Sequence, residues 1–198
     1  MKWRIAPEGG WGMKTLTLLR HAKSGWDDPV ARDFDRALNA RGKRGAAQIG
    51  QYLADHGLVF DHVLASPAVR VVETIDHVSS RYDLPVAPAW ERRIYLASAA
   101  TLIDLVAGLP DSVGRVLLVG HNPGLEDLVL MLVPADTDAA TDSARLREEV
   151  EIKFPTASLA ELQFDCAAWA DMGSTPATLT RFVRPRDLDP TLGPDDTD

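Results

Sequence analysis

Two histidines and two arginines stand close behind segments that are typical of buried β-strands. Arg20 and His21 follow one such segment directly, and His121 follows another after a single glycine. Arg70 lies shortly beyond a third segment, where a helix is expected to begin. Ligands of parallel sheets bind outside the carboxyl ends of the strands. We therefore expect these four side chains to converge at one edge of a sheet.

A pocket of this composition fits a phosphoryl group. Each guanidinium can donate paired hydrogen bonds to an oxyanion, and the charge of a phosphoryl transition state spreads over oxygens that need fixed positive partners. One imidazole can attack phosphorus and carry the phosphoryl group until water releases it. No carboxylate cluster suited to Mg²⁺ accompanies the histidines in the sequence. We therefore expect the arginines to neutralise the charge, with no metal and no cofactor.

The three strand segments share one arrangement along the chain. They span residues 15–19, 62–65 and 115–119, and each runs into a turn and then a helical pattern. Strands that alternate with helices predict a mostly parallel sheet with helices on both faces and right-handed crossovers. The sequence therefore predicts an α/β fold in three layers, an α/β/α sandwich.

Capping residues mark where the helices should begin. Asn39 and Ser98 are typical N-caps, and Ser66 and Asn122 are each followed by a proline that suits the first helical position. The expected helices run from 39 to about 56, from 66 to about 82, from 98 to 108 and from 122 to about 133.

The C-terminal third of the chain should begin with a loop. Residues 134–147 are rich in Asp, Ala and Thr without periodicity, and such a loop could fold over the site. Antiparallel edge strands are then expected at 151–154, 157–164 and 178–183.

The chain is expected to form one domain over residues 13–184. Residues 1–12 should be a disordered N-terminal extension, and Met13 is the expected biological start because a strand-like run follows it at once. Residues 185–198 are rich in Pro and Asp, which predicts a disordered acidic tail.

The composition excludes several classes of protein. Lys and Arg number 21 against 29 Asp and Glu, and the net charge of -8 argues against a nucleic-acid partner, which needs a basic face. No apolar run approaches the roughly 20 residues that span a bilayer. One cysteine, Cys166, allows no internal disulfide, and no cysteine and histidine spacing matches a zinc site. We expect a cytoplasmic protein with no membrane attachment.

Several motifs, in order along the chain, resemble those of one family. Residues 19–26, Leu-Arg-His-Ala-Lys-Ser-Gly-Trp, resemble the RHG motif of the histidine phosphatase superfamily. Together with residues 33–42 they resemble its phosphohistidine phosphatase branch, the SixA type. Matches at residues 65–74 and 119–124 follow in the family's order. The resemblance runs from about residue 14 to residue 184 and implies the phosphoglycerate mutase-like fold.

The resemblance also implies roles for individual residues. It makes His21 the nucleophile that carries the phosphoryl group. Three side chains are implied to grip the phosphoryl oxygens: Arg20, Arg70 and His121. Ser24 and Asp27 lie in the first loop, where relatives contact the substrate phosphate.

The proton donor to the leaving group departs from the family's pattern. Some members have an Asp directly after the second histidine, where this chain has Asn122, which cannot act as an acid. Mutase-like members place a Glu between the later motifs, and residues 89–95 are similar to that stretch, which makes Glu91 the candidate acid. The alternative is that Glu91 is a surface carboxylate paired with Arg92 or Arg93.

The leading hypothesis is a metal-independent phosphatase that hydrolyses phosphohistidine on a partner protein. A phosphomonoesterase for a small phosphate ester is the alternative within enzymes, and a phosphate-binding module without catalysis is the alternative of another class. The attacking imidazole must be neutral, whereas a cationic His121 would help to hold the phosphoryl group. Activity is therefore expected to titrate in the histidine range.

Overall fold

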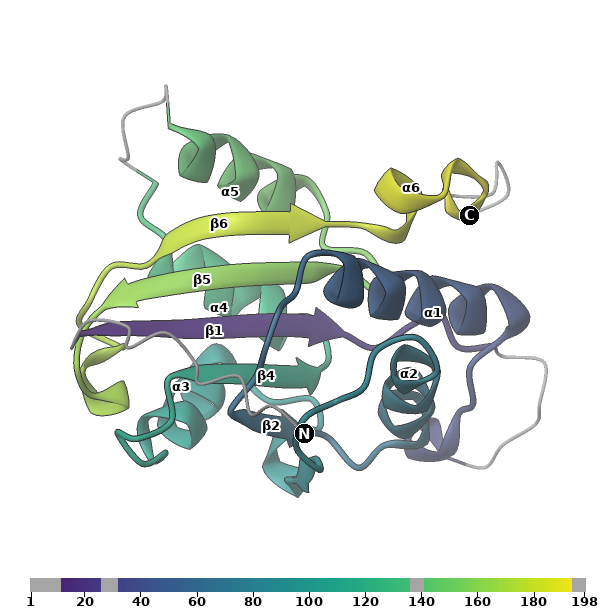
Figure 1. Ribbon diagram of the computed structural model, residues 1–198, viewed down its shortest axis with the longest axis horizontal. Helices are drawn as coiled ribbons and strands as arrows, with labels where there is room; N and C mark the ends of the chain where they lie inside the picture. Colours follow the sequence, from purple (N-terminus) through teal and green to yellow (C-terminus); the bar gives the residue numbers. More distant parts are fainter. Residues whose placement is uncertain (1–11, 26–31, 136–140, 194–198) are drawn as a thin grey trace, which may run out of the picture.

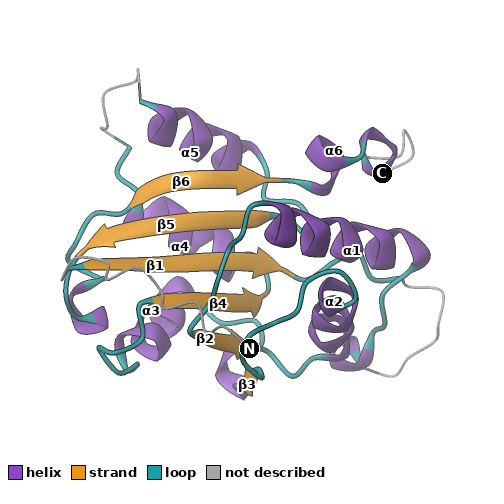
Figure 2. Cartoon of the chain, in the orientation of Figure 1, coloured by secondary structure: helices purple, strands orange, loops and turns teal. Residues whose placement is uncertain are grey.

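The computed structural model describes residues 12–25, 32–135 and 141–193. In these residues six strands form one sheet in the order β3-β2-β4-β1-β5-β6 (Figures 1 and 2). The strands are β1 Met13–Arg20, β2 His62–Ala65, β3 Ala89–Trp90, β4 Arg115–Gly120, β5 Leu159–Asp165 and β6 Thr178–Val183. β3, β2, β4 and β1 pair in parallel, whereas β5 pairs antiparallel with β1 and β6 antiparallel with β5.

The helices lie on both faces of the sheet. They are α1 Ala40–Asp55, α2 Val69–Ser79, α3 Ala99–Ala107, α4 Gly124–Leu132, α5 Asp142–Ile152 and α6 Pro185–Leu188. α1 and α2 cover one face of the sheet, and α3, α4 and α5 cover the other (Figure 1). Side chains of α1 and α2 form one buried apolar cluster with the sheet, and side chains of the other three helices form a second. The predicted three-layer α/β/α sandwich with a mostly parallel sheet is therefore confirmed.

The central strands are apolar on both faces because both faces are covered. In β1, Leu16 and Leu18 join the cluster under α3 and α4, while Leu19 joins the cluster under α1 and α2. Val116 and Val119 of β4 divide between the clusters in the same way. This is the arrangement that near-continuous apolar runs predict for strands buried on both sides.

The carboxyl ends of the parallel strands align at one edge of the sheet. Arg20 of β1 is in register with Gly120 of β4, and Ala65 of β2 is in register with Val119 of β4 and Trp90 of β3. The residues that follow these strands therefore emerge side by side, as the sequence predicts.

Two helices begin later than the capping signals predict. α2 begins at Val69 and α4 at Gly124, so the prolines at 67 and 123 precede the helices. The hydroxyl of Ser66 accepts a hydrogen bond from the amide of Ala68, inside the turn that leads to α2. The Asn39 and Ser98 caps are confirmed, because their side chains accept from the amides of the first helical turn.

Residues 134–154 differ most from the prediction. α5 occupies residues 142–152 where a loop and then a strand were expected, and Thr141 caps it by accepting from the amide of Ala144. Leu146 and Val150, one turn apart, are the only large apolar side chains among the four residues that it buries, the others being Ser143 and Ala144. A helix with so narrow an apolar stripe gives a weak periodic signal. The strands expected near 157–164 and 178–183 are confirmed as β5 and β6.

The expected disordered tail is ordered where the structure describes it. Residues 185–193 form α6 and a short 3-10 helix at Pro190–Leu192, and Arg41 of α1 donates to the carbonyls of Leu192 and Gly193. The backbone contacts to α1 hold a polar segment that has no apolar periodicity of its own. The predictions of disorder for residues 1–11 and 194–198 concern positions outside the described residues. No helix of the described part of the chain is long and apolar enough to span a bilayer.

Candidate active site

The two histidines expected to act together are neighbours. His21 follows β1 and His121 follows β4, and their ring centroids lie 5.2 Å apart. Both side chains are buried. The parallel pairing of β1 with β4 thus brings together residues that are 100 positions apart in the sequence.

The ring of His21 is held in one tautomer. Its Nδ1 lies 2.8 Å from the carbonyl oxygen of Ala22, which can only accept, so Nδ1 carries the hydrogen and Nε2 carries the lone pair. Burial lowers the pKa of His21 to about 3, and the nearby charges of Arg70 and Arg20 act in the same direction. His21 is therefore a neutral imidazole with a free lone pair at Nε2.

Arg70 fixes the second histidine in the opposite tautomer. Its Nη2 donates to Nδ1 of His121 at 3.2 Å, so that nitrogen accepts and Nε2–H of His121 donates to Oγ of Ser66 at 2.9 Å. Burial first, and then the charge of Arg70, lower the pKa of His121 to about 3. The expected cationic His121, and the expected titration of the site in the ordinary histidine range, are therefore not found in the free protein.

Arg70 is itself anchored by Asp33. The guanidinium donates to the carbonyl oxygen of Asp33 at 2.6 Å and to its carboxylate at 3.0 Å. The hydroxyl of Tyr95 donates to the same carboxylate at 2.7 Å, and its ring meets the ring of His121 edge-on. Burial raises the pKa of Asp33, but the hydrogen bond from Tyr95 and the charge of Arg70 outweigh it and lower the pKa overall.

Thr74 of α2 ties the first loop to this cluster. Its hydroxyl accepts from the amide of Ala22 at 2.9 Å and donates to the carbonyl of Arg70 at 2.6 Å. Sequence analysis predicts no role for Thr74 or Tyr95 and identifies Ser66 only as a helix cap. All three lie inside motifs matched to the family, so position within a motif is the signal that could have pointed to them.

Arg20 approaches the site from the end of β1. Its Nη1 donates to the carbonyl oxygen of Phe154 at 2.6 Å, and Asn122 donates to that oxygen as well. The buried Nε–H groups of Arg20 and Arg70 have no hydrogen-bond partner among the described residues. Burial lowers the pKa of the Arg20 guanidinium, with Arg70 contributing in the same direction. Two unsatisfied cationic donors beside two neutral imidazoles form a site that favours an oxyanion.

The structure places the other residues of the predicted site as follows. Ser24 is buried in the first loop, where its backbone pairs with Leu38. Asp27 lies outside the described residues. Asn122 also donates to the carboxylate of Glu126, so its amide is engaged on α4.

Glu91 follows β3 at the same edge of the sheet but faces Arg93. Its carboxylate accepts from the amide and from the guanidinium of Arg93, both at 2.9 Å. These hydrogen bonds lower the pKa of Glu91 to about 2. A group with that pKa is ionised at neutral pH in the free protein. The arrangement matches the surface ion pair that the sequence left open as the alternative.

The described residues hold no group of three or more His, Cys, Asp and Glu side chains that could bind a metal ion. The donors that converge at the site are guanidinium and imidazole groups instead. This set can hold a phosphoryl group, offer it a neutral nitrogen nucleophile and neutralise its oxygens.

Comparisons with known proteins agree with this chemistry. Residues 16–91 match the family model of the histidine phosphatase superfamily, branch 1. The uncharacterised protein Rv1276c of Mycobacterium tuberculosis is 36% identical over 169 residues, which cover 85% of this chain and 100% of that protein.

Two solved structures have the same fold and also resemble this chain in sequence. A candidate phosphohistidine phosphatase SixA from Nakamurella multipartitia is 28% identical, with a TM-score of 0.75 over 88% of this chain and 97% of that one. Another from Agrobacterium tumefaciens is 29% identical, with a TM-score of 0.69 over 86% and 97%. With its paired histidines, buried arginine and family motifs, the chain belongs to the histidine phosphatase superfamily, in its SixA-like branch.

Proposed function

We propose that this protein hydrolyses phosphohistidine on a protein substrate through a phosphoryl intermediate on His21. The observation that carries the proposal is the hydrogen bond from Nδ1–H of His21 to the carbonyl of Ala22. It leaves Nε2 with its lone pair, in a ring that burial keeps neutral, beside His121. A nucleophilic imidazole needs both conditions.

The reaction proceeds in two displacements. Nε2 of His21 attacks phosphorus and forms a bond to it while the bond from phosphorus to the substrate imidazole breaks. The substrate ring, protonated on its second nitrogen, leaves as a neutral imidazole, and the phosphorylated His21 ring keeps the hydrogen on Nδ1. Water then attacks phosphorus, the bond to Nε2 breaks, and inorganic phosphate leaves. Arg20 and Arg70 neutralise the phosphoryl oxygens, and the Nε2–H of His121 is a further donor that an oxygen can take over from Ser66.

The missing proton donor favours a phosphoramidate as substrate. Transfer from one imidazole to another exchanges one phosphorus–nitrogen bond for another, so it needs little help from an acid. An alkyl phosphate, whose alkoxide is a poor leaving group, needs a proton. Glu91 is ionised because Arg93 lowers its pKa to about 2, and Asn122 cannot serve as an acid.

The position of α5 also supports a protein substrate. Residues 142–147, part of the loop that could have folded over the site, instead belong to α5, which packs against β6 and α4. A site that these residues leave open can accept a histidine on the surface of another protein. The two solved structures named as candidate phosphohistidine phosphatases point to the same substrate.

The test compares substrates that differ in leaving group. We expect kcat/KM to be at least about 100-fold higher on a phosphohistidine-bearing protein domain than on a panel of sugar and nucleotide monophosphates, a ratio that corresponds to about 2.7 kcal/mol of transition-state stabilisation. A higher value on one of the esters would instead assign a phosphomonoesterase for a small metabolite. Phosphate binding without turnover of any substrate would leave a binding module.

A further inference from the structure

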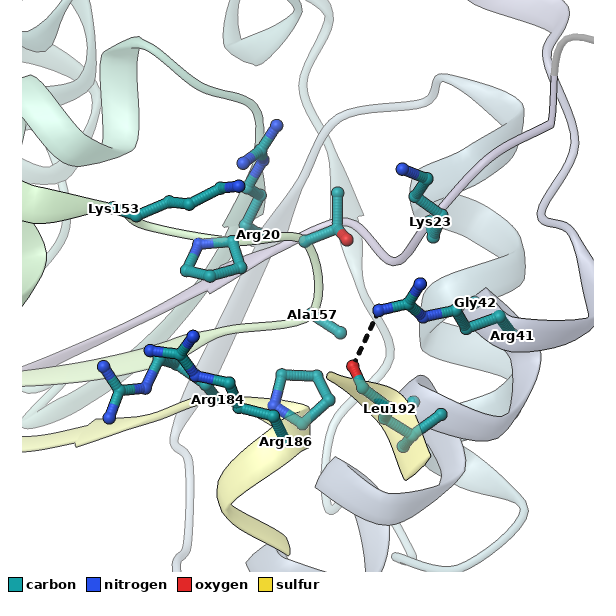
Figure 3. A pocket seen from close by; sticks show the side chains of 13 residues that line it. Arg20, Lys23, Arg41, Gly42, Lys153, Ala157, Arg184, Arg186 and Leu192 are labelled. Atoms are coloured by element: carbon teal, nitrogen blue, oxygen red, sulfur yellow. Dashed lines mark hydrogen bonds between the residues drawn. The ribbon is translucent and has the colours of Figure 1, made fainter. Parts of the chain in front are cut away.

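A second cationic feature adjoins the site and shares Arg20 with the proposed reaction, which uses none of its other basic side chains. A pocket of about 210 Å³ lies between the start of α1, residues 153–157 and α6 (Figure 3). Six of its lining side chains are basic: Arg20, Lys23, Arg41, Lys153, Arg184 and Arg186. Figure 3 shows Lys153, Arg184 and Arg186 on one side of the pocket and Lys23 and Arg41 on the other.

Within the part of the chain that the structure describes, acidic side chains compensate only part of the positive charge of this pocket. None of the described residues that line it is acidic, in a chain with a net charge of -8. Arg184 forms ion pairs with Glu149 and Asp187 outside the lining, and Arg41 donates to the carbonyls of Leu192 and Gly193. Lys153 and Arg186 are exposed to solvent. Cations gathered in a concave site raise the local concentration of anions.

The start of α1 adds to the positive electrostatic potential of the pocket. Gly42 and Gly45 of its first two turns line the pocket, so the positive end of the helix dipole lies beside the basic side chains. Gly42 is needed there because a Cβ would meet the carbonyl oxygen of Lys23 at 2.0 Å. The close approach of α1 to the first loop therefore helps to form the pocket.

Arg20 links the pocket to the reacting group. It lines the pocket and directly precedes His21 in the chain, and its charge lowers the pKa of both histidines. Arg20 thus belongs both to the pocket and to the electrostatic surroundings of the two histidines. The neighbouring site already accommodates the phosphoryl group, so the pocket is available for another part of the same substrate.

We propose that this pocket binds a second anionic group of the substrate, a carboxylate or a phosphate next to the phosphoryl group that His21 receives. The inference rests on the proposed function and specifies its substrate class. The second anion can come from an acidic residue beside the phosphohistidine of a protein or from a small phosphorylated molecule. In either case it lowers KM and leaves the chemical step unchanged, because it touches none of the reacting atoms.

The test uses substrate pairs that differ only in one negative charge. The first pair is a phosphohistidine peptide with Glu on both sides of the histidine and the same peptide with Gln. The second pair is Nα-acetyl-phosphohistidine with a free carboxylate and its carboxamide. Hydrolysis of phosphoramidate, which has no second anionic group, measures the reaction without any contribution from the pocket.

The variant that tests the pocket is Lys153→Gln combined with Arg186→Gln. Its matched control is Arg81→Gln combined with Arg115→Gln, which also removes two positive charges, but at the end of α2 and the start of β4, the opposite edge of the sheet. Melting temperatures of both variants confirm that they are folded.

We expect the anionic member of at least one pair to have a KM about tenfold lower in the wild type, equivalent to about 1.4 kcal/mol. The pocket variant should reduce this ratio to about twofold or less, whereas the control variant keeps it, and phosphoramidate should be hydrolysed with the same kcat by all three proteins. A preference in the peptide pair alone assigns an acidic protein substrate, and one in the small pair alone assigns a small molecule.

Two results would overturn the inference. Equal KM values within both pairs, with phosphoramidate hydrolysed, would show that the pocket takes no part of the substrate. A preference that persists in the pocket variant would place the anion elsewhere. If phosphoramidate is not hydrolysed at all, the proposed function itself fails, and the pocket loses its role in substrate binding with it.

Discussion

At the scale of single residues, the site depends on two imidazoles held in opposite tautomers. The carbonyl oxygen of Ala22 accepts a hydrogen bond from Nδ1–H of His21, and the guanidinium of Arg70 donates a hydrogen bond to the lone pair on Nδ1 of His121. One ring is thus left with a free lone pair and the other with an N–H donor at Nε2. In the proposed reaction, the division into nucleophile and oxyanion donor follows from hydrogen bonds to the backbone and to one arginine.

The tautomers can be observed directly by ¹⁵N NMR of the histidine rings. Burial lowers both pKa values to about 3, so both rings should remain neutral at pH 5, with the hydrogen on Nδ1 of His21 and on Nε2 of His121. The assignment of the two signals comes from His21→Gln and His121→Gln. Protonation of either ring above pH 5 in the free protein would contradict this electrostatic picture.

Arg70 should not be replaceable by lysine. A lysine keeps the charge but has no planar fork, so it cannot donate at once to Asp33, to His121 and to a phosphoryl oxygen. We expect Arg70→Lys to lower kcat/KM on phosphoramidate about 100-fold, as the loss of an oxyanion donor typically does. The NMR tautomer of His121 gives an independent readout. Unchanged activity would show that charge alone suffices.

At the scale of elements, the packing of α1 against α2 depends on one glycine. A Cβ at Gly50 would meet the carbonyl oxygen of Val78 at 2.3 Å, whereas a Cβ at Gly45 of the same helix would have ordinary contacts, the nearest with Pro185 at 3.7 Å. Because alanine is the better helix former, only steric contact distinguishes the two positions.

Gly50→Ala and Gly45→Ala therefore form a matched pair. We expect Gly50→Ala to lower the free energy of unfolding by about 2 kcal/mol and Gly45→Ala to raise it by up to about 1 kcal/mol. Urea titrations measure both. Equal effects in the two variants would mean that α1 and α2 are not packed as closely as described.

The secondary-structure elements also explain why the positions of the two histidines could be predicted from the sequence, whereas α5 and the C-terminal segment could not. The strand ends that carry His21 and His121 were predictable because β1 and β4 are buried on both faces and read as apolar runs. α5 buries few apolar side chains, so its helical periodicity is weak and the sequence did not predict it. The segment after α6 is held by the contacts of Arg41 with the carbonyls of Leu192 and Gly193, which no local pattern encodes. The anchoring of Arg70 by Asp33 needs two separate elements and could not be read from either alone.

At the scale of the whole molecule, the buried histidines link stability to pH. The pKa values of His21 and His121 fall from 6.5 to about 3 on folding, so between these values the unfolded chain binds more protons than the folded one. Stability contributed by the neutral rings is thus fully present above pH 6.5 and is lost as pH falls toward 3.

The expected loss is on the order of 5 kcal/mol for each histidine over that range. The free energy of unfolding, measured by urea titration from pH 7 to pH 4, should decrease, and His121→Gln should make the decrease smaller. If the wild type and His121→Gln show the same slope, His121 is not buried as a neutral ring.

The central claim is covalent catalysis by His21, and capture of the intermediate tests it most directly. Wild type and His21→Gln are mixed with phosphoramidate in EDTA, quenched within the turnover time, and examined by intact-protein and peptide mass spectrometry. We predict an acid-labile phosphoryl group on His21 in the wild type and none in the variant. A wild type that hydrolyses phosphoramidate in EDTA with no adduct on His21, or a His21→Gln variant that retains full activity, would contradict the account.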